Sequence, residues 1–170
     1  MLRRLIILLL IVGCKDENPE LENFNGITEI DIEGNIISED SNDWCGDYDE
    51  EMYKNINIAD CPSEIQIVES SGFSSIPTEY SLKPAYPNPF DSLVTIHYSL
   101  PEDSDVTLKI IDSAGNTVRM LGNADQAGGF YCISWDGRND DGDIVESDLY
   151  RVFIYANHFS CSGDLQFSPN

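Results

Sequence analysis

Polar and apolar residues alternate along the C-terminal half of the chain, which is the pattern of strands with one buried face. The first clear run covers 94–100, and its apolar members share one face: Val94, Ile96, Tyr98 and Leu100. A second run, Val106–Asp112, ends in Ser-Ala-Gly-Asn, whose Gly and Asn tolerate the positive φ of a tight turn. Apolar residues resume at Val118, so the two runs are predicted to form a hairpin.

Three further strands are predicted downstream. In Phe130–Trp135 the side chains of Tyr131, Ile133 and Trp135 face the same way, and an Asp-Gly turn follows. Leu149–Tyr155 alternates again, and a last short run covers Cys161–Phe167. Short strands separated by turn signals at intervals of roughly 8–12 residues, without helical periodicity, predict an all-β, antiparallel sandwich of about seven strands over 80–170.

Six short motifs occur in order along this region: Tyr86-Pro87-Asn88-Pro89-Phe90, Tyr98-Ser99-Leu100-Pro101, Asp112-Ser113-Ala114-Gly115, Ala127-Gly128-Gly129, Trp135-Asp136-Gly137 and Leu149-Tyr150-Arg151. In this order they resemble the Ig-like domain of flagellar hook-capping proteins. That domain type is similar to the C-terminal sorting domains of the type IX secretion system. The resemblance implies an Ig-like sandwich and a role in carriage or surface display rather than catalysis.

The N-terminus carries an export signal over 1–13. Arg3 and Arg4 are followed by the apolar run Leu5–Val12, which is too short to cross a bilayer. The segment ending at Gly13-Cys14 resembles a bacterial lipobox, which implies acylation of Cys14 and membrane attachment through palmitate-type chains. Each buried methylene contributes about 0.8 kcal/mol, so several chains hold a protein in the membrane. The alternative is an ordinary secretory signal in which Cys14 has no role.

Three charged residues follow the cysteine: Lys15, Asp16 and Glu17. They resemble the lysine-plus-acidic export signal of surface lipoproteins, which implies an outer-membrane protein that faces the outside of the cell. A charged, solvated tether on the periplasmic side is the alternative.

The segments between the two ends are predicted from composition. A tether covers 14–26, a small acidic β segment 27–69 and a Ser-rich linker 70–79, ahead of the sandwich at 80–170. Within the small segment we expect a hairpin around Gly34-Asn35 and a strand at Ile65–Val68. A segment of this size buries little surface alone, so it needs a disulfide or must dock on the sandwich.

With Cys14 assigned to lipid, four cysteines remain for two disulfides in an oxidising compartment: Cys45, Cys61, Cys132 and Cys161. Three pairings exist. Cys45–Cys61 is preferred because both cysteines lie in the N-terminal segment, and Cys132–Cys161 because both would lie on strands of the sandwich and point away from the Ile133/Trp135 core face. Zinc is the competing interpretation. It is disfavoured because no Cys-x-x-Cys pair is present and both histidines, His97 and His158, are distant in sequence from a suitable cysteine pair.

The charge of the chain excludes one class of partner. The formal net charge is −22, and removal of Arg3 and Arg4 with the signal takes it to about −24. No basic cluster remains to neutralise phosphates, so nucleic acid is not expected as a partner. Motifs of nucleophilic, phosphate-binding or zinc-dependent enzymes are absent from the sequence, and we predict no enzyme and no cofactor. Both histidines are interpreted as exposed residues, of a strand and of a turn.

Two loops could bind ligands. Oxygen donors for calcium gather after Trp135, where an Asn- and Gly-rich turn is the alternative interpretation: Asp136, Asn139, Asp140, Asp141 and Asp143. Trp44, Tyr48 and Tyr53 could stack on sugar rings or pack around the Cys45 bridge.

The predicted function is therefore that of a non-catalytic, lipid-anchored envelope protein with a display, docking or adhesion module. Its partners would be the membrane and an envelope protein or the secretion machinery. A sorting domain of the type IX kind and a calcium- or carbohydrate-binding module are the alternatives.

Overall fold

The computed structural model describes residues 29–30, 36–38, 44–45, 61, 66–67 and 76–170. The predictions for Cys14, Lys15–Glu17, Tyr48 and Tyr53 lie outside these residues. The elements are all strands: β1 (Glu29–Ile30), β2 (Ile36–Ser38), β3 (Gln66–Ile67), β4 (Ser81–Tyr86), β5 (Val94–Leu100), β6 (Ser104–Ile111), β7 (Thr117–Gln126), β8 (Gly129–Trp135), β9 (Asp148–Ala156) and β10 (Phe159–Phe167). In the part of the chain that is described, no helix is long and apolar enough to span a membrane.

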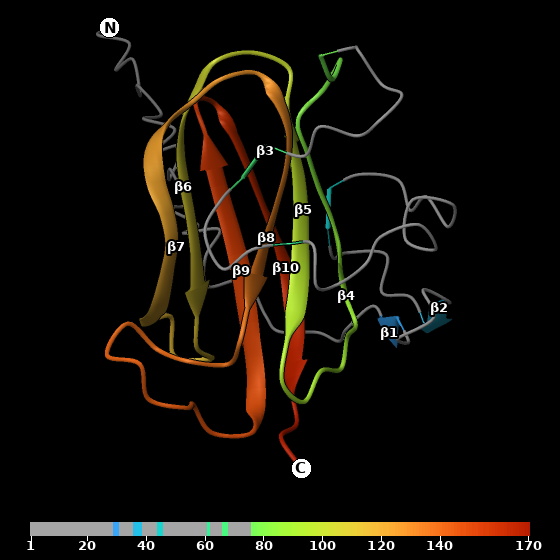
Figure 1. Cartoon of the computed structure of the whole chain (residues 1–170), viewed down its shortest axis with the longest axis vertical. Helices are drawn as coiled ribbons and strands as arrows, with labels where there is room; N and C mark the ends of the chain where they lie inside the picture. The colour runs from blue at the N-terminus through green and yellow to red at the C-terminus, as the bar shows by residue number, and fades with distance from the viewer. Residues whose placement is uncertain (1–28, 31–35, 39–43, 46–60, 62–65, 68–75) are drawn as a thin grey trace, which may run out of the picture.

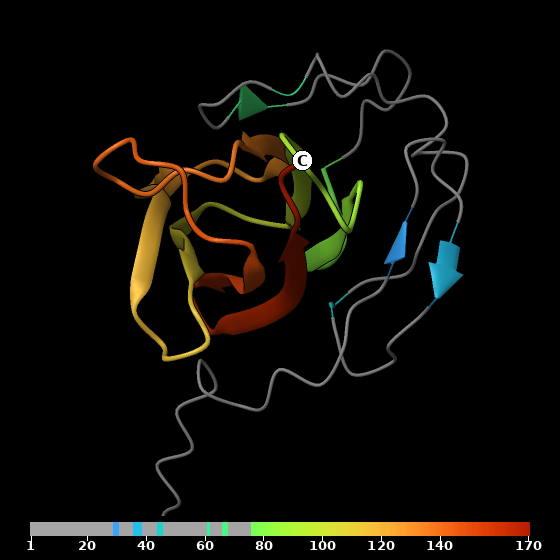
Figure 2. The same cartoon turned by 90° about the horizontal axis from the view of Figure 1, so that it is seen from below.

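Two four-stranded sheets face each other, as Figures 1 and 2 show. One has the order β10-β9-β6-β7 and the other β3-β8-β5-β4, and all pairings within them are antiparallel. The seven long strands β4–β10 form the sandwich, and the two-residue β3 extends one sheet beside β8. The prediction of an all-β antiparallel sandwich of about seven strands is confirmed.

The core lies between the sheets and consists of the residues that the alternation placed there. Ile96 and Ile133 are fully buried partners in the β5–β8 register, and Ile110 and Val152 occupy the equivalent place in the other sheet. Trp135 is 1% exposed and contacts the rings of Phe90 and Tyr150. Burial of one such side chain stabilises the fold by roughly 1.5–3 kcal/mol, so the alternating runs specify the sandwich.

The Tyr-Pro-Asn-Pro-Phe motif connects β4 to β5 and holds β10. The Asn88 amide is fully buried, donates to the Asp164 carbonyl at 2.9 Å and accepts from the Gln166 N–H at 2.9 Å. Phe90 then forms a parallel bridge with Phe167. The motif therefore joins the two sheets at one end of the sandwich.

The predicted hairpin is formed by β6 and β7. Asp112 Oδ1 accepts from the backbone N–H groups of Ala114 and Asn116, and Gly115 has a φ of 83°. Burial raises the pKa of the Asp112 carboxyl, but the hydrogen bonds from the Asn116 side chain and from the backbone of Asn116, Ala114 and Gly115 together outweigh burial, so the pKa is lowered. Gly115 thus supplies the positive φ that the turn chemistry predicted, whereas Asn116 has no positive φ and instead donates from its side-chain amide to the Asp112 carboxyl at 2.9 Å.

The preferred disulfide pairing is wrong. The bridges are Cys45–Cys161 and Cys61–Cys132. Cys132 lies on β8 and Cys161 on β10, which belong to different sheets. Cys161 joins the core cluster, whereas Cys132 alternates with the core residues Tyr131 and Ile133 and faces the other side of its sheet. The two thiols therefore cannot meet, and each pairs with a cysteine from the N-terminal segment.

The predicted small segment has its hairpin, β1 paired with β2. The strand expected at Ile65–Val68 is present as β3, but it pairs with β8 of the sandwich. The small segment and the sandwich are therefore joined by backbone pairing as well as by disulfides.

Candidate functional site

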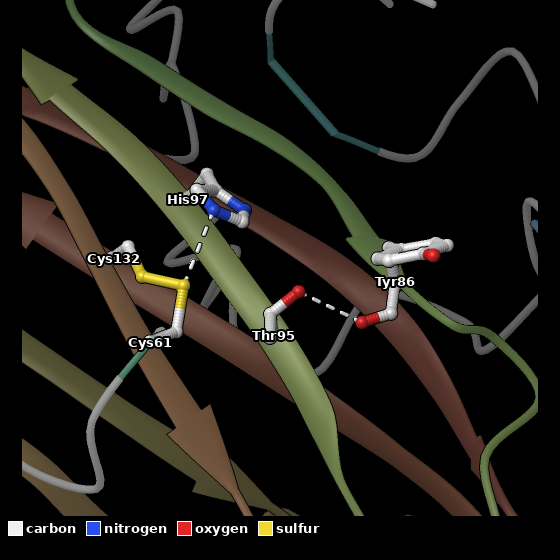
Figure 3. The surroundings of a disulfide bond; sticks show 5 residues. All are labelled: Cys61, Tyr86, Thr95, His97 and Cys132. Atoms are coloured by element: carbon white, nitrogen blue, oxygen red, sulfur yellow. Dashed lines mark hydrogen bonds between the residues drawn. A yellow bond between two sulfur atoms is a disulfide. The ribbon is translucent and has the colours of Figure 1, made fainter. Parts of the chain in front are cut away.

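A buried cluster of one histidine and two cysteines lies on the face of the β3-β8-β5-β4 sheet that points away from the core. Figure 3 shows His97 on β5 directed towards the bridge between Cys61 and Cys132. His97 and Cys132 are direct partners in the antiparallel β5–β8 register, so their side chains emerge on the same face. Cys61 is supplied by the N-terminal segment.

The cluster is closed to solvent. His97 is 8% exposed, Cys61 6% and Cys132 2%, and the His97 Nε2 atom lies 3.5 Å from Cys61 Sγ. Burial lowers the pKa of His97 to about 4, because a charged imidazolium loses its hydration there. The imidazole is neutral at pH 7. The neighbouring Thr95 hydroxyl donates a hydrogen bond of 2.8 Å to the Tyr86 carbonyl (Figure 3).

The interpretation of His97 as an exposed strand residue is wrong. All residues of β5 are buried, on both faces of the strand, because β5 lies between β4 and β8 and Cys61 packs over His97. His158 is exposed in its turn as expected, where it makes an edge contact with Tyr80. His97 and Cys132 are far apart along the chain but adjacent in the sheet, so their distance in sequence did not indicate that they lie together.

Oxidised sulfurs limit the chemistry of this cluster. A disulfide lacks the thiolate, which is the form of cysteine that acts as a nucleophile and as a metal ligand. Within the described residues, Cys61, His97 and Cys132 are the group whose donor atoms come together, all within 4.8 Å of one another. Reduction would convert this group into two thiols beside an imidazole.

The loop proposed for calcium is a structured turn that covers the edge strand β7. Asn139 Oδ1 accepts from the Asp143 N–H at 2.8 Å, and Asp140 Oδ1 accepts from the Met120 N–H at 3.1 Å. The Asp140 N–H donates to the Val118 carbonyl at 3.1 Å. Two of the predicted ligand side chains are therefore used as hydrogen-bond acceptors within the protein. Backbone groups of β7 are satisfied by the same contacts, which protects part of an exposed sheet edge.

Trp44 does not form an exposed platform for sugars. The Trp44 indole lies so close to Gly163 on β10 that any side chain there would clash with it. The backbone N–H of Trp44 donates to the Ser162 carbonyl at 3.0 Å. The next residue, Cys45, pairs with Leu82 on β4 and is bridged to Cys161 on β10. β4 and β10 are edge strands of opposite sheets, so these two residues close the seam between the sheets.

One ion pair is fully enclosed. Arg151 on β9 and Asp164 on β10 are register partners, 4% and 1% exposed, with Nε–Oδ1 at 2.6 Å and Nη2–Oδ2 at 3.0 Å. Sequence reasoning missed this pair, although Arg151 belongs to the Leu-Tyr-Arg motif. The sequence feature that could have indicated the pair is the charged Arg151 between the two core positions Tyr150 and Val152 of one strand.

Comparison with protein families gives a match for one region of the chain. Residues 90–158 match the family model of the FlgD Ig-like domain. The matched part covers β5–β9, and it agrees with the Ig-like domain predicted from the motifs.

Among solved structures, the chain is similar to PorZ of Porphyromonas gingivalis, described as an essential bacterial surface component of the type-IX secretion system. The identity is 24%, the TM-score is 0.37, and the similarity covers 61% of this chain and 13% of the PorZ chain. This chain thus spans only a small part of the length of PorZ. No curated protein matches it.

Proposed function

We propose that this chain is a non-catalytic, lipid-anchored protein of the cell envelope whose Ig-like sandwich is a display, docking or adhesion module. The observation that carries the proposal is the pair of disulfides that fasten the N-terminal segment to the sandwich. Disulfides persist outside the cytoplasm, which agrees with an exported chain. The match to an Ig-like family supports a module that binds or presents rather than catalyses.

The lipid would enter at Cys14, and the tether of 14–26 sets how far the module reaches. Twelve extended peptide steps of about 3.5 Å give a reach of roughly 40 Å from the lipid to the small segment. Beyond this stalk, the bridges make the small segment and the sandwich one covalent unit. A force on the sandwich would therefore reach the anchor without passing through the linker of 70–79.

Lipid attachment is tested by growing cells with labelled palmitate. The wild-type chain should carry label and partition into detergent, and Cys14→Ser should lose both properties. An unlabelled wild-type chain whose mass equals that of the bare polypeptide contradicts the anchor.

Surface exposure is tested by adding protease to intact and to lysed cells. The wild-type protein should be cleaved in both, and replacement of Lys15, Asp16 and Glu17 by alanine should protect it in intact cells while palmitate is retained. Glu20→Ala/Glu22→Ala, in the same tether, is the matched control and should leave exposure unchanged. Protection of the wild-type protein in intact cells contradicts the surface location.

A type IX sorting domain is the second candidate, supported by the order of the six motifs. A removable domain would be cut near the linker of 70–79, but both disulfides span this linker and would keep the two pieces together. This favours a resident module. Mass spectrometry of the mature protein with and without reductant distinguishes them: an intact Asn170 supports residence, and a fragment released only after reduction supports sorting.

A calcium- or carbohydrate-binding module is the remaining alternative. It requires a rise in melting temperature on adding calcium or polysaccharide, because a ligand that binds the folded state stabilises it. We expect no rise with calcium, since Asn139 and Asp140 already accept hydrogen bonds from the protein. A rise that Asp140→Asn abolishes would favour this alternative.

A further inference from the structure

We propose that the reduced form of this protein binds Zn²⁺ through Cys61, His97 and Cys132, so that zinc replaces the disulfide as the cross-link between the N-terminal segment and the sandwich. The inference is independent of lipid attachment and of the role of the sandwich. It rests on the chemistry of the three donors, their separation and their burial.

The donor set is the first argument. Two thiolates and one imidazole are the ligands that zinc prefers, and three protein ligands with a water in the fourth position make an established zinc coordination. Hard cations such as Ca²⁺ and Mg²⁺ take oxygen ligands instead. The charge also fits, because two thiolates and Zn²⁺ sum to zero. Burying a neutral metal centre costs less hydration free energy than burying a charged one.

The separation of the donors is the second argument. Zinc bonds of about 2.3 Å to sulfur and about 2.0 Å to nitrogen at tetrahedral angles place S and N roughly 3.5 Å apart and two sulfurs roughly 3.8 Å apart. The Cys61 Sγ to His97 Nε2 distance is already 3.5 Å, and all three donor atoms lie within 4.8 Å of one another. The two sulfurs need only separate from bonding distance by less than about 2 Å.

The scaffold is the third argument. His97 and Cys132 are fixed as direct partners on the long strands β5 and β8, so two of the three ligands are held by the sandwich itself. The third ligand, Cys61, comes from the N-terminal segment, whose β3 pairs with β8 at only two residues. Local opening at this short pairing gives a reductant access to the bridge at a small free-energy cost.

The reaction is balanced with a dithiol as the reductant. The dithiol transfers two electrons and two protons to the Cys61–Cys132 bridge, which becomes two thiols, and the dithiol becomes a disulfide. Zinc then displaces the two thiol protons, which are released to solvent as two Zn–S bonds form. Binding is therefore expected to weaken as the pH falls.

The experiment uses the full chain with Cys14→Ser, to remove the unrelated thiol. After reduction with a phosphine, Co²⁺ is titrated as a spectroscopic probe and then displaced by Zn²⁺. We expect one metal per chain, a sulfur-to-cobalt charge-transfer band and a rise in melting temperature with Zn²⁺. The oxidised chain should give none of these.

Two variants identify the ligands. His97→Gln keeps a polar side chain of similar size and should weaken Zn²⁺ binding by more than about 100-fold, since even the loss of an outer partner of a ligand costs about 10–100-fold. His158→Gln removes the second histidine of the chain, which is exposed and outside the cluster, and should leave the affinity unchanged.

The other cysteine pair is the last control. Cys45→Ala/Cys161→Ala should retain the cobalt band, whereas Cys61→Ala/Cys132→Ala should lose it. Circular dichroism of each reduced variant reports whether the sandwich is folded. Three outcomes overturn the proposal: a reduced, folded chain that binds no zinc, binding that His97→Gln leaves unchanged, or a reduced chain that is unfolded and that zinc does not restore.

Discussion

Asp164→Asn removes one charge from the enclosed pair with Arg151 and leaves the guanidinium buried without its counter-charge. The two side chains are 4% and 1% exposed and meet through two hydrogen bonds, of 2.6 and 3.0 Å. Taking one partner from such a pair costs about 3–5 kcal/mol, because the remaining charge is neither hydrated nor neutralised. We expect the free energy of unfolding to fall by this amount.

Urea denaturation with both disulfides intact measures the effect, as a fall in the midpoint at an unchanged slope. Arg151→Met should cost a similar amount. Arg151→Met/Asp164→Leu should cost much less than the sum of the single changes, since replacing both charges by apolar groups is often close to neutral. The double-mutant cycle should therefore give an interaction energy of about 2 kcal/mol or more.

Asp136→Asn is the matched control. Asp136 pairs with Arg138 at 3.4 Å, but the two side chains are 52% and 45% exposed, so this change should cost about 1 kcal/mol or less. The reasoning is refuted if Asp164→Asn costs no more than Asp136→Asn, or if the two changes at Arg151 and Asp164 are simply additive.

Three further predictions concern the seam and the histidine. Gly163→Ala should lower the free energy of unfolding by roughly 1–3 kcal/mol, because the new methyl group clashes with the Trp44 indole. This cost should disappear in a Trp44→Ala background, and a cost that persists there would contradict the contact between Trp44 and Gly163. Cys45→Ala/Cys161→Ala opens a loop with a sequence separation of 116 and should cost about 4–5 kcal/mol by loop entropy, measured by denaturation under non-reducing conditions. For His97, the pKa of about 4 in the folded chain lies below the ordinary histidine pKa of 6.5. The neutral form of His97 therefore contributes stability that is complete above pH 6.5 and is lost as the pH falls towards 4, by up to about 3 kcal/mol. A His97→Gln variant should lack this part of the pH dependence, and an identical profile would contradict the assignment.

The core of this protein follows from its sequence because strand alternation has a period of two. Once Ile96, Ile133 and Val152 are placed in strands, every second residue of each run falls on the same face as they do, without reference to other strands. The positions of turns could also be predicted from the sequence, because the backbone conformation of a turn is set by the few residues in it, such as Gly115. The fold class and the buried aromatic residues were therefore local properties of the chain.

The cysteine pairing and the candidate site depended on which strands became neighbours. Cys132 and Cys161 both lie in alternating runs, and nothing local shows that their strands belong to different sheets. His97 is polar in the sequence pattern, and its burial depends on Cys61 from a distant segment that packs over it.

Alternation thus determined which side of each strand meets the core, because that property belongs to the backbone of one strand. The tertiary structure alone decided which residues cover the face of each sheet that points away from the core. Those contacts depend on strand order and register, which join residues far apart along the chain and which only the packing of the whole domain selects.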